Sequence, residues 1–164
     1  MKKFIIRLLL TLLAIIAFIA AVVGIEYFGG QPMGLFSGSR PANLGYSAGK
    51  FAPPAWKPNS VSSTIEKSDA HFIEPLKFSG ASAEAWKKLH GIVKGSPRVN
   101  IISDRPGYLY AEFKSAGMGF VDDVEFALDE AASAIHLRSA SRLGIRDLGV
   151  NRARIETIRT QFGK

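Results

Sequence analysis

An arginine-rich stretch near the C-terminus carries the side chains best suited to chemistry in this sequence. Residues 138–156 read RSASRLGIRDLGVNRARIE and contain five arginines, two acidic residues and two glycines. The glycines free the loop backbone, and guanidinium groups can hold an anion together with the free amides at the start of a following helix. The predicted anion-binding residues are Arg138, Arg142, Arg146, Asn151 and Arg152.

The positive charge of this stretch is local. Residues 138–164 contain seven basic and two acidic residues, whereas the chain from Glu26 onward has a net charge of only +4. Ion pairs that tie the loop to a sheet are the competing interpretation of these arginines. The residues predicted to form such structural ion pairs are Asp122, Asp123, Glu125 and Asp147. A third hypothesis is a hydrolase or transferase that uses Asp122, His136 and the arginines.

Two alternating segments, 119–128 and 134–141, are expected to position these side chains as paired strands. A register that joins their apolar faces sets Phe126 opposite Leu137, and the same register brings Glu125 opposite Arg138. Asp122 falls on the apolar face, where a carboxylate without hydrogen-bond partners costs several kcal/mol. The sequence therefore predicts ion pairs on the outer face and a hydrogen-bonded Asp122 on the inner one.

The sequence has no recognisable catalytic or cofactor-binding signature. It contains no cysteine, which excludes disulfides, thiol nucleophiles and zinc sites with cysteine ligands. The three histidines do not have metal-site spacing, and no GxSxG, P-loop or GxGxxG motif is present. We therefore expect no metal ion and no cofactor, and the catalytic residues, if there are any, remain unassigned.

The N-terminus is typical of a membrane segment. Lys2, Lys3 and Arg7 precede residues 8–25, an uncharged run of 18 residues that as a helix is about 27 Å long, close to the thickness of bilayer hydrocarbon. A cleaved signal peptide is the alternative, but it would normally have a shorter apolar run and a small-residue cleavage site. We expect an uncleaved anchor that contacts the bilayer through residues 4–28. The positive residues place the N-terminus in the cytoplasm and the rest of the chain outside the inner membrane, in the periplasm or the extracellular space.

After this segment the chain changes from a glycine- and proline-rich stretch, residues 29–59, to alternating and helical patterns. The order of the elements predicts an α+β fold, in which an antiparallel β meander packs against two helices. The predicted strands are 69–78, 98–104, 108–114, 119–128 and 134–141, and the predicted helices are 82–94, capped by Ser82, and 151–162, capped by Asn151.

Four separated strings resemble the domain-of-unknown-function family 1499. They are RPANLGYSAGKFAP, PNSVSS, FVDDVEF and RSASRLGIRDLGVNRARIE, which together extend from about Arg40 to Phe162. The resemblance implies a small domain of bacterial envelope proteins and plastid relatives, with no established activity. It also implies that residues 40–59 belong to the folded unit, so the expected organisation is an anchor in 1–28, a linker in 29–39 and a single domain in 40–164. Family members often carry cysteines where this chain has Pro54 and Ser60.

These observations predict a membrane-anchored, non-cytoplasmic binding or structural module. Its expected ligand is an anionic small molecule, a lipid headgroup or an acidic protein surface, bound by the arginine-rich loop. Nucleic acid is not expected as a partner, because the domain should lie outside the cytoplasm. The hydrolase or transferase remains the alternative.

Overall fold

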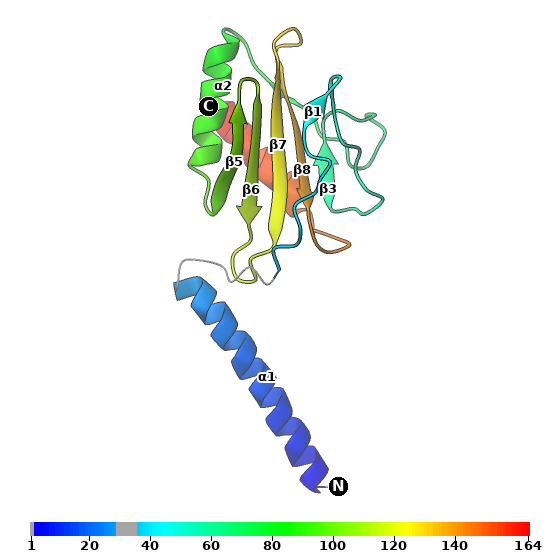
Figure 1. Cartoon of the computed structure of the whole chain (residues 1–164), viewed down its shortest axis with the longest axis vertical. Coiled ribbons are helices and arrows are strands. Elements are labelled where there is room, and N and C mark those ends of the chain that lie inside the picture. Colours follow the sequence, from blue (N-terminus) through cyan, green and yellow to red (C-terminus); the bar gives the residue numbers. More distant parts are fainter. Residues whose placement is uncertain (1, 29–35) are drawn as a thin grey trace.

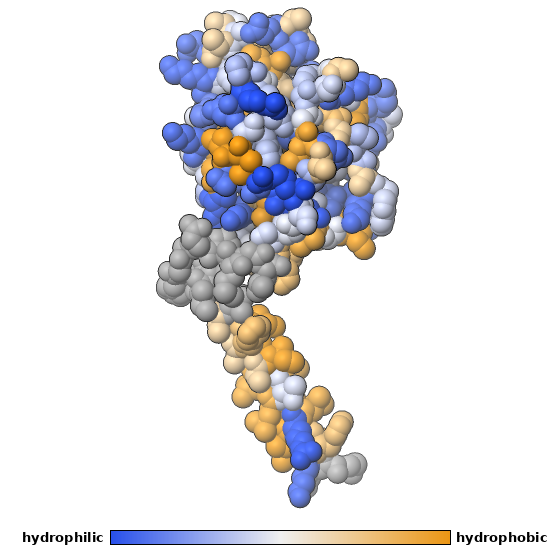
Figure 2. All heavy atoms as spheres, viewed as in Figure 1, coloured by the Kyte–Doolittle hydropathy of each residue, from blue (hydrophilic) through white to orange (hydrophobic). Residues whose placement is uncertain are grey.

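The computed structural model describes residues 2–28 and 36–164, so residues 29–35 of the predicted linker lie outside the described part. The first element is helix α1 (Lys2–Phe28). Its segment Lys3–Ala21 has a mean hydropathy of 2.7 and buries none of its surface against the rest of the protein. Figure 2 shows the hydrophilic start of α1 in blue and the apolar remainder in orange. This helix is long and apolar enough to cross a membrane, as an anchor or as a signal sequence.

An antiparallel sheet forms the centre of the domain. The strand order is β3-β8-β7-β6-β5, and β4 also pairs with β8. The strands are β3 (Ser60–Ser62), β4 (Leu76–Lys77), β5 (Val99–Arg105), β6 (Tyr108–Lys114), β7 (Val121–Asp129) and β8 (Ala134–Ser141). Phe126 pairs with Leu137 and Glu125 with Arg138, as the alternation predicted. The predicted α+β meander is therefore confirmed.

Two helices, α2 (Ser82–Lys94) and α3 (Val150–Phe162), cover one face of this sheet. In Figure 1 α3 crosses behind the strands. Both helices bury residues three or four positions apart, because such residues share one side of a helix. The buried helix residues are Ala85, Leu89 and Val93 of α2 and Asn151, Ile155, Ile158 and Phe162 of α3. The apolar ones form one hydrophobic core with Leu109, Phe126 and Leu137 of the sheet.

The opposite face, which we call the outer face, is covered by residues 36–51. This segment contains the short hairpin β1 (Tyr46–Ser47) and β2 (Lys50–Phe51), seen in cyan in Figure 1. Phe51 is buried against Tyr108 and Tyr110 of β6. The sheet is thus covered on both sides. Charged side chains of the outer face are buried under residues 36–51, which we call the covering segment.

The predicted strand 69–78 is wrong except at its end. Only Leu76 and Lys77 form a strand, and Phe72 makes one isolated bridge to Ser62. The Asp69 carboxylate accepts a hydrogen bond from the backbone N–H of His71 at 2.8 Å, which closes a local turn instead of an extended strand.

The two predicted helix caps are also wrong. Helix α2 has Ala81 at its N-cap position, and the Ser82 hydroxyl donates to Glu130 instead. Helix α3 begins one residue earlier than predicted, after Gly149. The backbone N–H of Asn151 donates to the Asp147 carboxylate at 2.9 Å, so Asp147 does the capping that we had assigned to Asn151.

Candidate functional site

Three buried carboxylates lie side by side on the outer face of the sheet, and we call them the outer carboxylate cluster. Glu112 of β6 pairs directly with Asp123 of β7, and Glu125 lies two residues further along the same strand. Their exposed fractions are 7% for Glu112, 1% for Asp123 and 0% for Glu125. An ionised carboxylate at such depth requires a cationic partner.

Arg142, in the loop after β8, joins two of the three carboxylates. Its Nε and Nη2 atoms donate to both oxygens of Asp123, at 3.0 and 2.7 Å, and Nη2 also donates to Glu112. Tyr110 donates its hydroxyl proton to Asp123 at 2.6 Å. Burial, with the neighbouring Asp123 carboxylate, raises the pKa of Tyr110, so the phenol keeps its proton and remains a donor.

Glu125 has three donors of its own. Arg138 donates to Oε2 at 2.8 Å, the Tyr108 hydroxyl donates to Oε1 at 2.8 Å, and the backbone N–H of Gly45 donates to Oε1 at 2.6 Å. Gly45 has φ +129°, a backbone conformation that favours glycine and here aims the N–H at the carboxylate. This bond ties the segment 36–51 to the middle of the sheet.

Glu112 also accepts hydrogen bonds from a second arginine, Arg40, which lies in the covering segment. Nε and Nη2 of Arg40 donate to its Oε1 at 3.0 and 2.7 Å. Burial alone would raise the pKa of the Glu112 carboxyl, but the hydrogen bonds from Arg142 and Arg40 outweigh it and hold the pKa below its ordinary value. Glu112 therefore stays ionised at neutral pH, and the three carboxylates of the cluster are paired with Arg40, Arg138 and Arg142.

A second polar network lies on the helix face, where Asp122 was expected to need partners. Its carboxylate accepts the Ser141 hydroxyl at 2.5 Å and forms an ion pair with Arg154 of α3. Arg154 also donates to the side-chain oxygen of Asn151 at 2.8 Å. We call these residues, together with Ser139, Asn59 and Asp147, the α3 network.

Asn151 is the centre of the α3 network and is fully buried. Its amide nitrogen lies 3.0 Å from the Asn59 carbonyl oxygen and 2.9 Å from the Ser141 hydroxyl and the Asp147 carboxylate. Its amide oxygen accepts the Ser139 hydroxyl at 2.5 Å. Burial would raise the pKa of Asp147, but N–H groups of Asn151 and Gly149 that donate to it lower the pKa below its usual value. The side chain of Asn151 thus fixes the start of α3 to the sheet.

The residues of the predicted anion site do not converge on one point. Arg138 and Arg142 lie on the outer face, in the outer carboxylate cluster, whereas Asn151 lies on the helix face with its backbone N–H bound to Asp147. Arg152 donates to two backbone carbonyl oxygens of residues 70 and 72 at 3.0 and 2.8 Å. Arg146 is exposed and makes no hydrogen bond or ion pair with other described residues.

Asp122 and His136 also lie on opposite faces of the sheet. His136 contacts the Ser63 hydroxyl at 3.2 Å and stacks on Tyr46 of the covering segment, with ring centroids 6.1 Å apart. Burial lowers the pKa of His136, so its ring is neutral at neutral pH. A single small substrate cannot reach Asp122 and His136 together. Among residues 2–28 and 36–164, no three His, Asp or Glu side chains are grouped to hold a metal ion.

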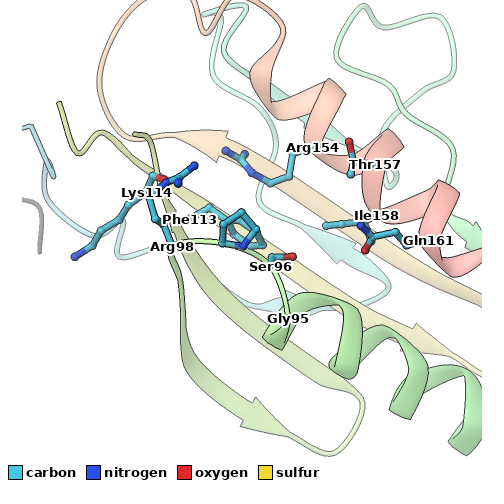
Figure 3. A pocket seen from close by; sticks show the side chains of 10 residues that line it. Gly95, Ser96, Arg98, Phe113, Lys114, Arg154, Thr157, Ile158 and Gln161 are labelled. Carbon is cyan, nitrogen blue, oxygen red and sulfur yellow. The ribbon is translucent and has the colours of Figure 1, made fainter. Parts of the chain in front are cut away.

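A cavity of about 250 Å³ opens between the loop that joins α2 to β5, the end of β6 and residues 154–161 of α3. Arg98 and Lys114 lie on one side and Arg154 on another, with Phe113 between them (Figure 3). The remaining lining residues are Gly95, Ser96, Pro97, Thr157, Ile158 and Gln161, and none of the lining residues is acidic. The cavity therefore offers positive charge next to apolar surface.

The sequence interpretation missed Glu112 and Arg40 as members of the ion-pair network, whereas Arg154 was among the arginines expected to pair with the acids of the sheet. Alternation along β6 contains a signal for Glu112, because Tyr108, Tyr110 and Glu112 share the face that Asp123 occupies on the next strand. No such signal exists for Arg40, which reaches Glu112 across 72 residues. The cation-lined cavity was missed as well, since its residues come from three segments that are far apart in the sequence, 95–98, 113–114 and 154–161.

We expect Asp122→Ala to lower the free energy of unfolding by about 3 kcal/mol, because it leaves the largely buried Arg154 without its carboxylate. Urea denaturation of the full chain measures this change. Glu66→Ala, which removes an exposed acid, is the matched control and should change stability by less than about 0.5 kcal/mol. Equal unfolding midpoints for both variants would show that the Asp122–Arg154 pair does not stabilise the fold.

We expect the stability that Glu112 contributes to be present above its ordinary pKa of 4.5 and to be lost as the pH falls through its lowered folded-state pKa. Arg40→Gln should cost about 1 kcal/mol at neutral pH, since half of the Arg40 side chain is exposed. The difference from the wild type should shrink toward zero as the pH falls through the lowered folded-state pKa of Glu112, since the carboxyl is then protonated in both proteins. Lys50→Gln removes an exposed charge and serves as the control in the same urea titrations. A difference that stays constant with pH would contradict the assigned pair.

Comparison with known proteins gives a family but no activity. No curated protein and no solved structure matches the chain. The family model described as "Protein of unknown function (DUF1499)" matches residues 50–162, which is more than half of the chain and includes both polar networks except Arg40 and Gly45. The chain therefore belongs to the DUF1499 family of proteins of unknown function.

Proposed function

We propose that this chain is a membrane-anchored binding module that holds an anionic ligand outside the cytoplasm and performs no catalysis on it. In this proposal α1 is an uncleaved anchor in the inner membrane with its N-terminus in the cytoplasm. The uncharged run of α1, residues 8–25, supports a membrane span, and the three basic residues at the start of the helix support this orientation.

One observation carries the binding part of the proposal, namely that the cavity is lined by three cations and by no acid. The charge of Arg154 is partly neutralised, because Arg154 forms an ion pair with Asp122. Arg98 and Lys114 have no ion pair within the described residues, so their charge is available to a ligand. Phe113 and Ile158 add apolar surface, which favours an anion with an apolar part over a fully solvated one.

The enzymatic alternative has less support in the geometry. Asp122 and Asp123 are buried and paired with Arg154 and Arg142, and they point to opposite faces. No carboxylate that could act as a general base lines the cation-lined cavity. The ligand is therefore expected to leave the protein unchanged.

The proposed topology predicts that a reporter active only outside the cytoplasm is active when fused after Lys164. The fusion should remain at full length in the membrane fraction after alkaline extraction, because α1 spans the bilayer. Replacing Lys2, Lys3 and Arg7 by Gln should reduce correct insertion. Reporter activity in the cytoplasm, or a mature N-terminus near residue 26, would contradict the anchor.

The cavity predicts that octyl phosphate binds the full chain in zwitterionic nanodiscs more tightly than inorganic phosphate does, and that neutral octyl glucoside does not bind. The double variant Arg98→Gln, Lys114→Gln should weaken octyl phosphate binding about tenfold, because it removes both free cations. Isothermal titration calorimetry measures the three ligands.

Lys50→Gln is the control for charge, since this exposed lysine lies on the outer face, away from the cavity. It should leave the affinity unchanged. If octyl phosphate fails to bind, or if the wild type and both variants bind it equally, the cavity is not the anion site.

A further inference from the structure

One end of the sheet carries almost all of the exposed apolar side chains of the domain. Of the seven large apolar side chains that are exposed within residues 36–164, six lie at the end where β6 and β8 finish and β7 begins. We call this the apolar end, and its residues are Phe36, Met118, Leu143, Ile145, Leu148 and Val150. Figure 1 shows the turn between β6 and β7 and the loop after β8 together at the lower end of the sheet. Apolar exposure this concentrated marks an interaction surface.

The chain enters the domain at this same end. Phe36 stacks on Phe120 with ring centroids 5.1 Å apart. Gly38 has φ +64° and lies so close to the loop after β8 that a Cβ atom there would be 2.9 Å from Cβ of Arg142 and 3.1 Å from Cγ of Leu143. The covering segment is therefore fixed against the apolar end from its first described residues.

The chain between α1 and Phe36 limits how far this end can lie from the membrane. Helix α1 ends at Phe28, and seven residues, 29–35, separate it from Phe36. Seven residues span at most about 25 Å even when fully extended. If α1 is in the bilayer, the apolar end is the part of the domain closest to the lipid surface.

Charge at the apolar end is complementary to anionic headgroups. Arg98 and Arg146 are exposed there, and Lys114 is partly exposed. Asp122 and Asp123, near this end, are buried and neutralised by arginines. Asp147 lies in the same loop as Arg146, is partly exposed and accepts hydrogen bonds from the N–H groups of Gly149 and Asn151. Three cations against this one acid leave an excess of positive charge among the apolar side chains, which suits the boundary between headgroups and acyl chains.

Leu148 shows that the apolar character of this end is not explained by the fold itself. Its exposed fraction is 94%, the highest among the exposed large apolar side chains. Its backbone has φ +54°, a conformation that leucine adopts at a cost and asparagine or glycine adopts readily. A leucine at this position contributes nothing to the core, so its side chain is suited to a contact outside the domain.

We propose that the apolar end docks on the surface of the bilayer that α1 spans, with Ile145 and Leu148 entering the headgroup region and Arg98 and Arg146 facing lipid phosphates. This inference rests on the membrane anchoring in the proposed function. It adds that the domain is held in a fixed orientation against the membrane rather than free on its tether.

The absence of cysteine permits a clean test, because a single introduced cysteine is the only labelling site in the full chain. Met118→Cys places a fluorophore at the apolar end, and Ala131→Cys places the same fluorophore in the turn between β7 and β8 at the other end. The labelled chains are reconstituted in vesicles of phosphatidylcholine and phosphatidylglycerol that contain lipids with a nitroxide on the acyl chain. We expect the nitroxide to quench the Met118→Cys label at least twofold more than the Ala131→Cys label.

A second substitution tests whether the exposed leucine mediates the contact. Leu148→Asn in the Met118→Cys background should reduce the quenching by at least half while the melting temperature stays the same or rises, because asparagine tolerates the left-handed backbone. Ala132→Asn is the control, since Ala132 is exposed in the turn between β7 and β8 at the other end of the sheet. It should leave the quenching unchanged.

Failure of docking and failure of the anchor give different results. Equal quenching of the two labels, with the protein retained in the vesicles after alkaline extraction, would overturn docking and leave the anchor intact. The apolar end would then need a different occupant, such as a partner protein. Loss of the protein from the vesicles on extraction would overturn the anchor and docking with it.

Discussion

The burial of three carboxylates on the outer face of the sheet is the constraint on which the rest of this domain depends. Glu112, Asp123 and Glu125 are at most 7% exposed, and each would cost several kcal/mol without a cation. The cations come from β8, from the loop after it and from residue 40. Charge balance therefore brings three separate segments onto one face, and the covering segment 36–51 is held by polar bonds as well as by its apolar side chains.

The same constraint explains why apolar side chains of the loop after β8 reach solvent. Arg142 is fixed at the sheet by Asp123 and Glu112, and Asp147 is fixed at the start of α3 by N–H groups of Gly149 and Asn151. Residues 143–146 connect these two fixed points, and none of them belongs to the hydrophobic core. Leu143 and Ile145 consequently remain exposed, as does Leu148 in the turn that precedes α3.

Hydrophobic alternation was sufficient to predict the meander and the pairing of β7 with β8. The apolar faces of the two strands lie on the same side of the sheet only when odd-numbered residues of one strand pair with even-numbered residues of the other. The pair Glu125–Arg138 and the inward position of Asp122 follow from that parity. Arg40 could not be predicted as a partner, since it lies in a segment without periodicity, 72 residues from Glu112. Asn151 is not the cap, because α3 already includes it and its side-chain oxygen accepts from Ser139 and Arg154, while the Asp147 carboxylate accepts from the N–H groups at the start of the helix.

Whether an arginine in this fold is available to a ligand depends on the distance to the nearest buried acid. Arg138 and Arg142 lie on the outer face beside buried carboxylates and form ion pairs with Glu125 and Asp123. Arg98 and Lys114 lie at the start of β5 and the end of β6, beside a cavity that no acid lines. These positions are also at the apolar end of the sheet, because the end of β6 adjoins the turn that carries Met118. In the docked orientation that we propose, an anion with an apolar chain would reach the cavity from the lipid side, which would give a physical reason for the cation-lined cavity and the apolar end to occur together.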